Sequence, residues 1–269
     1  MKTLEDHTIL YDNECPLCVT YTRAFVSTGM LDEAGRKSYN ESVGKIDGVD
    51  WDRARNEIAL VNHRDHTVAY GADAIVAVLA NRFPALRLFT RVRLLRWLMS
   101  KLYSFISYNR KVVAPGKVFE GAASCTPSMH YGYRWAYILL TWFIASLVLA
   151  NYTRLLVPLV PASTFGREFL VCGGQLVFQG FAVWMLHRQR FVHYLGNMMT
   201  VSLLGALLLL PAFFLHGMIT SPVPYTIYFI TVVAIMFLEH YRRVKILELP
   251  WVVCFTWVLY RFIVLGIIL

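Results

Sequence analysis

Two cysteines separated by two residues, Cys15 and Cys18, are the side chains whose types and spacing indicate chemistry most directly. They follow a short apolar run at residues 8–11, and a segment of helical pattern begins between them at Pro16. A thiol at the start of a helix faces unpaired N–H groups and the positive end of the helix dipole, which favour its thiolate. Proline suits the first helical turn, where its missing N–H would have no partner. This order predicts a redox pair in which Cys15 attacks a disulfide and Cys18 resolves the intermediate.

Three other interpretations of the pair stay open. It could supply half of a zinc site, although no second CxxC or close Cys/His pair follows in the N-terminal part of the chain. It could be a structural disulfide, which would add little stability in so short a loop, or a retained but unreactive thioredoxin-like motif. The carboxylates of Asp12 and Glu14 oppose thiolate formation, because they carry the same charge. Asp12 could also tune the pKa of the thiols or accept a proton. We favour redox chemistry, without a metal.

The motif at residues 11–18 resembles that of the DCC family of thiol-disulfide oxidoreductases, which is named for its Asp-Cys-Cys motif, here Asp12, Cys15 and Cys18. Asn13 stands where the family usually has glycine, and asparagine tolerates the left-handed conformations that such a turn requires. The resemblance covers roughly residues 7–112 and implies a thioredoxin-like fold and thiol-disulfide exchange. Its other matches are Gly71-Ala72-Asp73-Ala74, Leu102-Tyr103 and Asn109-Arg110.

An α/β domain is predicted to position the two cysteines. The pattern predicts strands at residues 8–11, 57–61 and 67–70, a weak strand at 36–39, and helices at 16–28, near Trp51 and at 73–82. The CxxC motif would then lie at the carboxyl end of the first strand, where open α/β sheets place their sites. We interpret Asp73 as the N-cap of its helix.

Charge is distributed unevenly along the chain. Residues 1–80 contain 8 basic and 13 acidic residues, whereas residues 81–117 contain nine basic residues and no acidic one. Apolar and aromatic residues alternate with these basic ones, and Pro84 should divide the segment into two helical pieces. Such a segment is typical of a helix on a membrane surface that binds anionic lipids, although the last packed helix of the redox domain could look the same. We expect no nucleic-acid partner.

The rest of the chain has the composition of a membrane protein. The sequence is 57% hydrophobic with a mean hydropathy of +0.49. We divide the whole sequence into an α/β domain at residues 1–112, a linker at 113–133 and a transmembrane helical domain at 134–269. Segments long enough to cross a hydrocarbon core about 30 Å thick lie at about 134–157, 167–187, 192–216, 222–240 and 249–269. This predicts an up-and-down bundle of about five spans.

The distribution of Lys and Arg among the loops predicts the orientation of this bundle. Basic residues concentrate before the first span, between the second and third, and between the fourth and fifth. This side should face the cytoplasm. The sequence therefore predicts a multi-pass protein of the plasma (inner) membrane with the redox domain in the cytoplasm and the C-terminus outside. No apolar region precedes residue 8, so no signal peptide is expected.

Polar residues within the predicted spans are costly in lipid and therefore point to a polar interior. Arg261 lies inside the fifth span, and Gln175 and Gln179 share one face of the second. Glu168 is the acidic residue expected nearest to Arg261 in depth. These residues could line an intramembrane polar site, or they could make interhelical hydrogen bonds while Arg261 extends to the interface. No role is assigned to the remaining cysteines, Cys125, Cys172 and Cys254.

The combined prediction is a membrane-anchored thiol-disulfide oxidoreductase that acts on a protein or small-molecule thiol or disulfide and has no cofactor. One alternative is a membrane transporter or scaffold whose thioredoxin-like domain docks a partner or senses redox state. A second alternative is a relay that passes electrons between thiols and a quinone. A cytoplasmic site would normally reduce its substrate, because cytosolic thiols are kept reduced.

Overall fold

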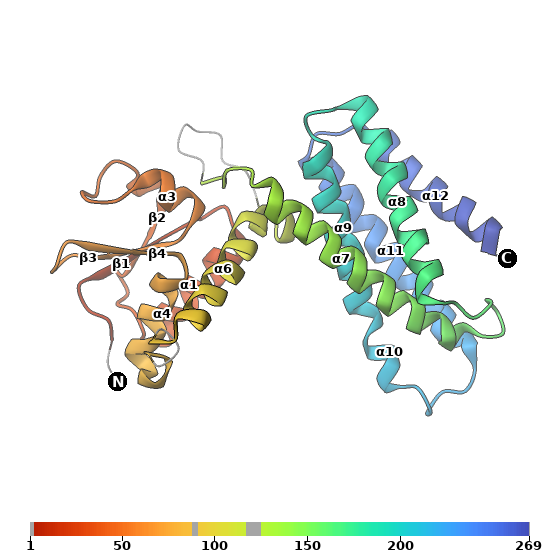
Figure 1. The fold of residues 1–269 in the computed structure, drawn as a ribbon, viewed down its shortest axis with the longest axis horizontal. Helices are drawn as coiled ribbons and strands as arrows, with labels where there is room; N and C mark the ends of the chain where they lie inside the picture. Colours follow the sequence, from red (N-terminus) through yellow and green to blue (C-terminus); the bar gives the residue numbers. More distant parts are fainter. Residues whose placement is uncertain (1–2, 88–90, 117–124, 269) are drawn as a thin grey trace. The chain divides into compact units, whose positions relative to one another are not determined.

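The computed structural model describes residues 3–87, 91–116 and 125–268. It divides into two compact units, Met1–Tyr133 and Arg134–Leu269 (Figure 1). The predicted architecture, an α/β unit followed by a bundle of apolar helices, is confirmed. Residues 88–90 and 117 of the basic segment, and residues 117–124 of the predicted linker, lie outside the described part of the chain.

The N-terminal unit is built on a four-stranded mixed sheet with the order β2-β1-β3-β4. Strand β1 (His7–Tyr11) is parallel to β2 (Arg36–Ser38) and antiparallel to β3 (Ala59–Asn62), which forms a hairpin with β4 (Thr67–Tyr70). In β1, Ile9 packs on one side of the sheet and Leu10 on the other, as the two-residue period of a strand requires. Apolar residues on both faces suit a strand covered on both sides.

Helices cover both faces of this sheet (Figure 1). On one face lie α1 (Pro16–Ser27), α4 (Gly71–Arg82) and α6 (Arg93–Val113), where Phe25 and Val78 pack against Ile9. On the other face lie α2 (Tyr39–Ser42) and α3 (Trp51–Asn56), packed around Leu10. A short 3-10 helix, η1 (Pro84–Leu86), separates α4 from α6 as Pro84 predicted.

The ends of α1 and α4 show which sequence signals were correct. Helix α1 begins at Pro16, with Cys15 as its N-cap, and ends just before Gly29, whose positive φ of 68° closes the helix. The prediction that Asp73 caps its helix was wrong. Helix α4 begins two residues earlier with Tyr70 at the N-cap, and Asp73 lies in the first turn, where it pairs with Arg96 at 2.7 Å.

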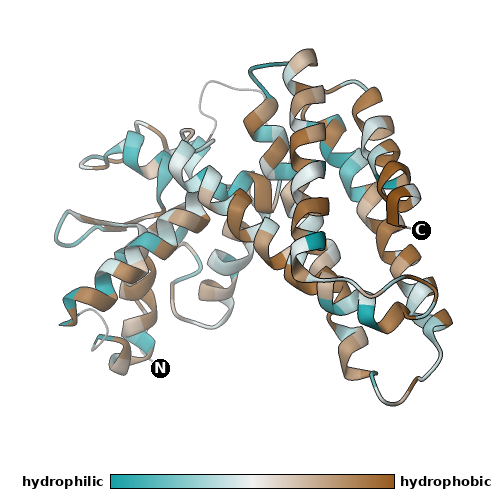
Figure 2. Ribbon diagram, turned by 45° about the vertical axis from the view of Figure 1, so that its right-hand side comes forward, coloured by the Kyte–Doolittle hydropathy of each residue, from teal (hydrophilic) through white to brown (hydrophobic). Residues whose placement is uncertain are grey.

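The C-terminal unit is a bundle of apolar helices (Figure 2). Its long helices are α7 (Tyr131–Tyr152), α8 (Phe165–Leu186), α9 (Phe191–Leu209), α11 (Pro222–Ile246) and α12 (Val252–Ile268). Short helices η2 (Thr153–Leu156) and α10 (Pro211–Phe214) extend α7 and α9. Within the described part of the chain, four segments are long and apolar enough to cross a membrane: Tyr131–Leu156, Phe165–Leu186, Phe191–Phe214 and Pro222–Ile246. Helix α12 is equally apolar but has 17 described residues, fewer than the about 20 of a typical span.

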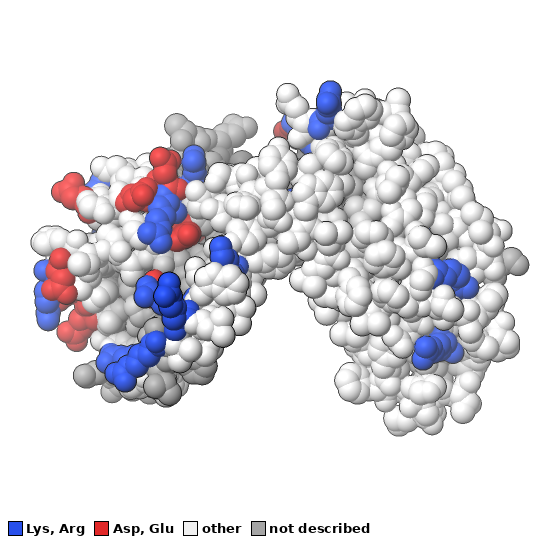
Figure 3. All heavy atoms as spheres, viewed as in Figure 1, with Lys and Arg blue, Asp and Glu red and all other residues white. Residues whose placement is uncertain are grey.

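Helix α9 forms the centre of this bundle. Tyr194, Met198 and Val201 are each at most 1% exposed, and they pack against α8, α11 and α12. Figure 3 shows acidic and basic side chains together on the N-terminal unit, whereas the visible face of the C-terminal unit carries few charges. The two units therefore have the surfaces expected of a water-facing domain and a lipid-facing domain.

Candidate functional site

The two cysteines lie at the junction of β1 and α1. Cys15 is the N-cap residue of α1, and its backbone N–H donates to the Asp12 carbonyl at 3.3 Å. Cys18 lies one turn further along the helix. Both thiols are free in this structure, Cys15 is fully buried, and Cys18 is partly exposed. The predicted order of strand, loop, CxxC and helix therefore brings both sulfur atoms to one end of α1.

Hydrogen bonding between the two thiols separates their acidities. The pKa of Cys15 is lowered to about 6, chiefly because the Cys18 thiol donates a hydrogen bond to its sulfur. Burial opposes this shift, the Cys18 backbone N–H and Arg110 favour it, and Asp12 opposes it. As the hydrogen-bond donor in a buried place, Cys18 has its pKa raised. At neutral pH the pair is thus a Cys15 thiolate beside a Cys18 thiol.

The carboxylates that flank the motif are paired with cations of α6. Asp12 is 3% exposed and its Oδ2 accepts from Arg110 Nε at 3.2 Å and lies 3.4 Å from Lys111 Nζ. Glu14 Oε2 is 2.8 Å from Lys111 Nζ. Asp12 Oδ1 also accepts from the Glu14 backbone N–H at 2.9 Å, which fixes the loop before the cysteines. The negative charge that we expected to oppose the thiolate is therefore compensated within the cluster.

The other donors of Arg110 bind α3, α6 and the chain at Cys125. Its Nη1 donates to the Asn56 carbonyl at 3.1 Å and to Ser107 Oγ at 3.0 Å. Its Nη2 donates to the carbonyls of Arg55 and Cys125, both at 2.8 Å. The sequence pointed to Arg110 only through the family resemblance. Local patterns do not reveal a partner 98 residues away from Asp12.

A cavity of about 260 Å³ adjoins Cys18. Its walls come from β1, α1, α3, α4, α6 and the residues just before β3, and they are mainly apolar and aromatic. Tyr103, another residue of the resemblance, accepts the Ile58 backbone N–H at 2.7 Å, and burial raises its pKa to about 12. The lining residues are Leu10, Tyr11, Asp12, Leu17, Cys18, Tyr21, Ala54, Glu57, Ile58, Ile75, Tyr103, Ile106, Ser107, Arg110 and Cys125.

The chain that follows α6 packs against the cysteine loop. A Cβ atom added to Gly116 would lie 1.7 Å from the Glu14 carbonyl oxygen and 3.2 Å from Pro16 Cδ, so only glycine fits there. Both contacts are with residues adjacent to Cys15. Cys125 is 2% exposed, its thiol donates to the Arg55 carbonyl at 3.7 Å, and burial raises its pKa to about 12. In this state Cys15 has no access to solvent, and Cys125 is a protected thiol.

The polar residues predicted within the spans are only partly brought together. Arg261 Nη1 donates to Gln175 Oε1 at 2.8 Å, and its guanidinium stacks 3.2 Å from the centre of the Trp257 ring. Gln179 Oε1 instead accepts from the Tyr194 hydroxyl at 2.8 Å. Of the two partners that the sequence offers to Arg261, the face of Gln175 and Gln179 is contacted through Gln175, whereas Glu168 pairs with its neighbour Arg167 at 2.9 Å. Among the residues that the structure describes, Arg261 has no acidic partner.

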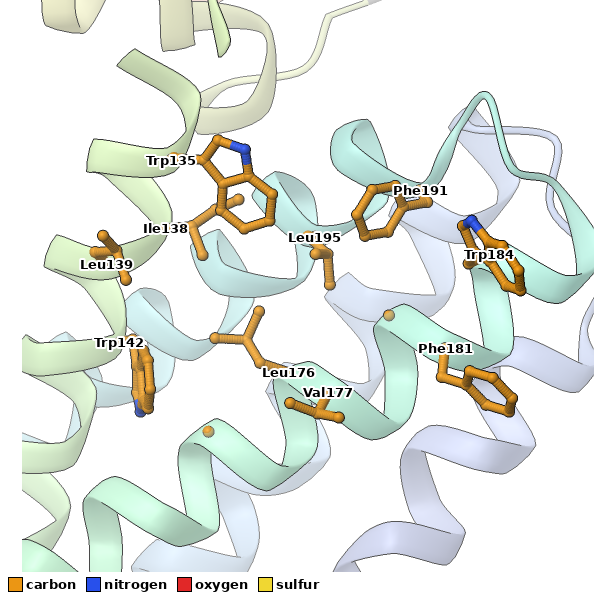
Figure 4. Close-up of a pocket in the computed structure, with 12 residues that line it drawn as sticks. Trp135, Ile138, Leu139, Trp142, Leu176, Val177, Phe181, Trp184, Phe191 and Leu195 are labelled. Atoms are coloured by element: carbon orange, nitrogen blue, oxygen red, sulfur yellow. The ribbon is translucent and has the colours of Figure 1, made fainter. Parts of the chain in front are cut away.

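Sequence analysis missed the polar chain that continues beyond Gln179. The Tyr194 hydroxyl is 2.9 Å from His240 Nε2, and the His240 ring stacks on Trp257 with their centres 5.1 Å apart. A concave surface of the bundle lies away from this polar chain. It is an apolar groove of about 380 Å³ lined by α7, α8 and α9, with Trp135, Trp142 and Trp184 along it (Figure 4). The described residues include no group of three or more His, Cys, Asp or Glu side chains that could hold a metal ion.

Residues 9–114 match the family model described as DCC1-like thiol-disulfide oxidoreductase. The match begins within β1 and contains the cysteine pair, the other three strands and α6, and it agrees with the family resemblance of the motif. Comparison with curated proteins and with solved structures gave no match.

The contact of Gly116 with the cysteine loop predicts a measurable effect on Cys15. In the Gly116→Val variant the segment must move off the loop, because overpacking costs about 1–3 kcal/mol. We expect iodoacetamide to alkylate Cys15 about tenfold faster or more, as measured by mass spectrometry of the full-length protein. The matched control is Gly132→Val, where an added Cβ meets only the His130 side chain, at 3.3 Å. Equal rates in the Gly116→Val variant and the unmodified protein would contradict the contact.

Proposed function

We propose, on the premise that residues 9–114 form a DCC1-like thiol-disulfide oxidoreductase domain, that Cys15 and Cys18 exchange disulfides with a substrate at a membrane surface. The observation that carries this proposal is the hydrogen bond from the Cys18 thiol to Cys15, which lowers the pKa of Cys15 to about 6. The apolar helices of the second unit anchor this chemistry to the bilayer. This function needs no cofactor in the bundle.

In this proposal the Cys15 thiolate attacks one sulfur of the substrate disulfide. A mixed disulfide forms, and the first substrate sulfur leaves as a thiolate that takes up a proton. The Cys15 sulfur no longer carries the charge that raised the pKa of Cys18, so the Cys18 proton becomes easier to lose. Cys18 then attacks Cys15, releases the second substrate thiol and leaves a Cys15–Cys18 disulfide. The substrate gains two electrons and the protein dithiol loses them, and a second dithiol resets the pair.

Asp12 serves in this scheme as a positioning residue. It holds the loop through the Glu14 backbone N–H and joins it to Arg110, which also favours the Cys15 thiolate. Cys15 is fully buried and Gly116 lies against the residues on both sides of it, so exchange requires the chain around Cys15 to move. Reaction with a substrate is therefore coupled to the chain that leads into the first membrane helix.

The proposed location is the cytoplasmic surface of the plasma (inner) membrane, with α6 lying against anionic lipids. The loop charges of the sequence support this orientation. A reducing direction follows from the location, because cytosolic thiols are kept reduced.

Two cysteine variants test the exchange. Cys15→Ser should abolish reduction of a model disulfide by the full-length protein. Cys18→Ser should accumulate a mixed disulfide between Cys15 and the substrate, because the second attack is lost; a mass shift that reductant reverses would reveal it. Alkylation of both cysteines at equal rates, with no trapped adduct, would contradict the assignment and favour the scaffold alternative.

Reporter fusions test the orientation. A C-terminal reporter that is active only outside the cytoplasm should be active, and an N-terminal one should be silent. The opposite pattern would show that the bundle crosses the membrane in the opposite orientation. A C-terminus in the cytoplasm together with a cytoplasmic N-terminus would mean that the 17-residue α12 does not cross the bilayer.

A further inference from the structure

Helix α6 carries an exposed apolar stripe on the side that does not pack into the N-terminal unit. Its members recur at helical spacing on one face, and each is between 49% and 71% exposed. A contiguous apolar surface of this kind marks an interaction site on a water-soluble domain. The stripe consists of Leu94, Trp97, Leu98, Leu102 and Ile106.

The charges beside the stripe identify its partner as a lipid surface. Arg91, Arg93 and Lys101 are exposed next to it, and residues 81–117 contain no acidic residue. A helix with Trp and Leu on one face and basic residues beside them is typical of the boundary between headgroups and acyl chains. Anionic lipids complement its charge. The first candidate span begins at Tyr131, so the same chain holds α6 near a bilayer.

The stripe leads into the cavity beside Cys18. Ile106, at its C-terminal end, is 49% exposed and also lines this cavity. Leu17, which lies between the two cysteines in the sequence, is 38% exposed and lines the cavity as well. An apolar surface thus extends from the proposed lipid contact of α6 to the redox pair.

The cavity walls favour an apolar occupant. Its polar lining groups already have protein partners: Arg110 and Asp12 bind each other, Ser107 donates to the Asn56 carbonyl at 2.6 Å, and Glu57 pairs with Arg53. Apart from the thiols of Cys18 and Cys125, the remaining walls are aliphatic or aromatic. A polar group placed there would lose its hydrogen bonds to water without finding new ones.

We infer that the cavity beside Cys18 binds an apolar group that is attached next to the disulfide of the substrate. The substrate lies in the interfacial layer of the bilayer and reaches the cavity along the stripe of α6. This inference rests on the proposed function and names its substrate class: a disulfide bonded next to an apolar chain, on a lipid-like molecule or on a membrane-embedded polypeptide. Exchange then follows the same two steps. Cys15 forms the mixed disulfide, Cys18 resolves it, and two thiols are released for two protein thiols oxidised.

Two probes with the same anchor test this inference. Each is a mixed disulfide of 2-nitro-5-thiobenzoate with palmitoylated cysteine amide, and in one of them a polyethylene glycol spacer separates the palmitoyl chain from the cysteine. The reduced full-length protein is placed in vesicles of phosphatidylcholine and phosphatidylglycerol, and release of the coloured thiolate is followed. Each rate is divided by the rate with dithiothreitol. We expect the spacer-free probe to react about tenfold faster or more, as one apolar contact in a pocket can achieve.

Matched variants connect this preference to the stripe and the cavity. In Ile106→Gln the ratio of the two normalised rates, spacer-free over spaced, should fall to within about threefold of unity. In Phe83→Gln this ratio should stay as high as in the unmodified protein. Phe83 is exposed to a similar extent, 51%, but lies outside α6. A third probe carries the same disulfide on a leucine-rich transmembrane peptide and shows whether the apolar group belongs to a lipid-like molecule or to a polypeptide. A higher normalised rate for either of these than for the spaced probe supports the inference.

Two outcomes would overturn the inference, and they separate it from the proposed function. If both probes react at equal normalised rates, exchange occurs but the site faces water. If the preference survives Ile106→Gln, the apolar group is bound elsewhere. If neither probe reacts while Cys15 alkylates normally, the proposed function itself fails.

Discussion

The buried ion pair between Asp12 and Arg110 is the interaction on which the arrangement of the N-terminal unit depends. It joins the loop before the cysteines to a helix 98 residues later in the chain. Both residues are at most 6% exposed, so loss of either partner would leave a buried charge at a cost of about 3–5 kcal/mol. The same guanidinium binds the end of α3 and the Cys125 carbonyl. The sheet, α6 and the chain that leads to the membrane are thereby fixed around the CxxC motif.

This pairing also explains how a reactive thiolate can exist beside two carboxylates. Lys111 and Arg110 compensate Glu14 and Asp12, so the hydrogen bond from Cys18 becomes the dominant influence on Cys15. Burial protects the thiolate from water, and Gly116 lies against the residues on both sides of it. The unit thus combines an activated cysteine with restricted access. This combination suits an enzyme whose substrate approaches from one defined surface.

Local signals in the sequence were sufficient for the elements that carry the cysteines. The β-branched run of β1, Pro16 at the first turn and Gly29 after the helix are short-range features, and each was placed correctly. Features that depend on tertiary structure were not accessible. The partner of Asp12 lies far along the chain, and nothing local indicated that Gly116 would lie against Glu14 and Pro16. Asp73 has the residue type of an N-cap, but its carboxylate binds Arg96 instead.

The same distinction holds in the membrane unit. The ends of the predicted spans placed Glu168 nearest to Arg261 in depth among the acidic residues. In the structure the carboxylate of Glu168 instead pairs with the adjacent Arg167. Arg261 is accommodated by Gln175 and by the face of Trp257. Gln179, Tyr194 and His240 then form a buried hydrogen-bonded chain of the kind that holds membrane helices together. These contacts hold the helices of the bundle together.

The central claim is that Cys18 activates Cys15, and a pH titration of Cys15 alkylation in the full-length protein tests it most directly. The rate should fall as the pH decreases through about 6, because the thiolate is lost below its pKa. In Cys18→Ala the midpoint should move upward, since the thiol that donates to Cys15 is gone, while Cys18→Ser retains a donor and should lie between the two. A midpoint near the ordinary cysteine value of about 8.5 in the unmodified protein, unchanged in Cys18→Ala, would contradict the account.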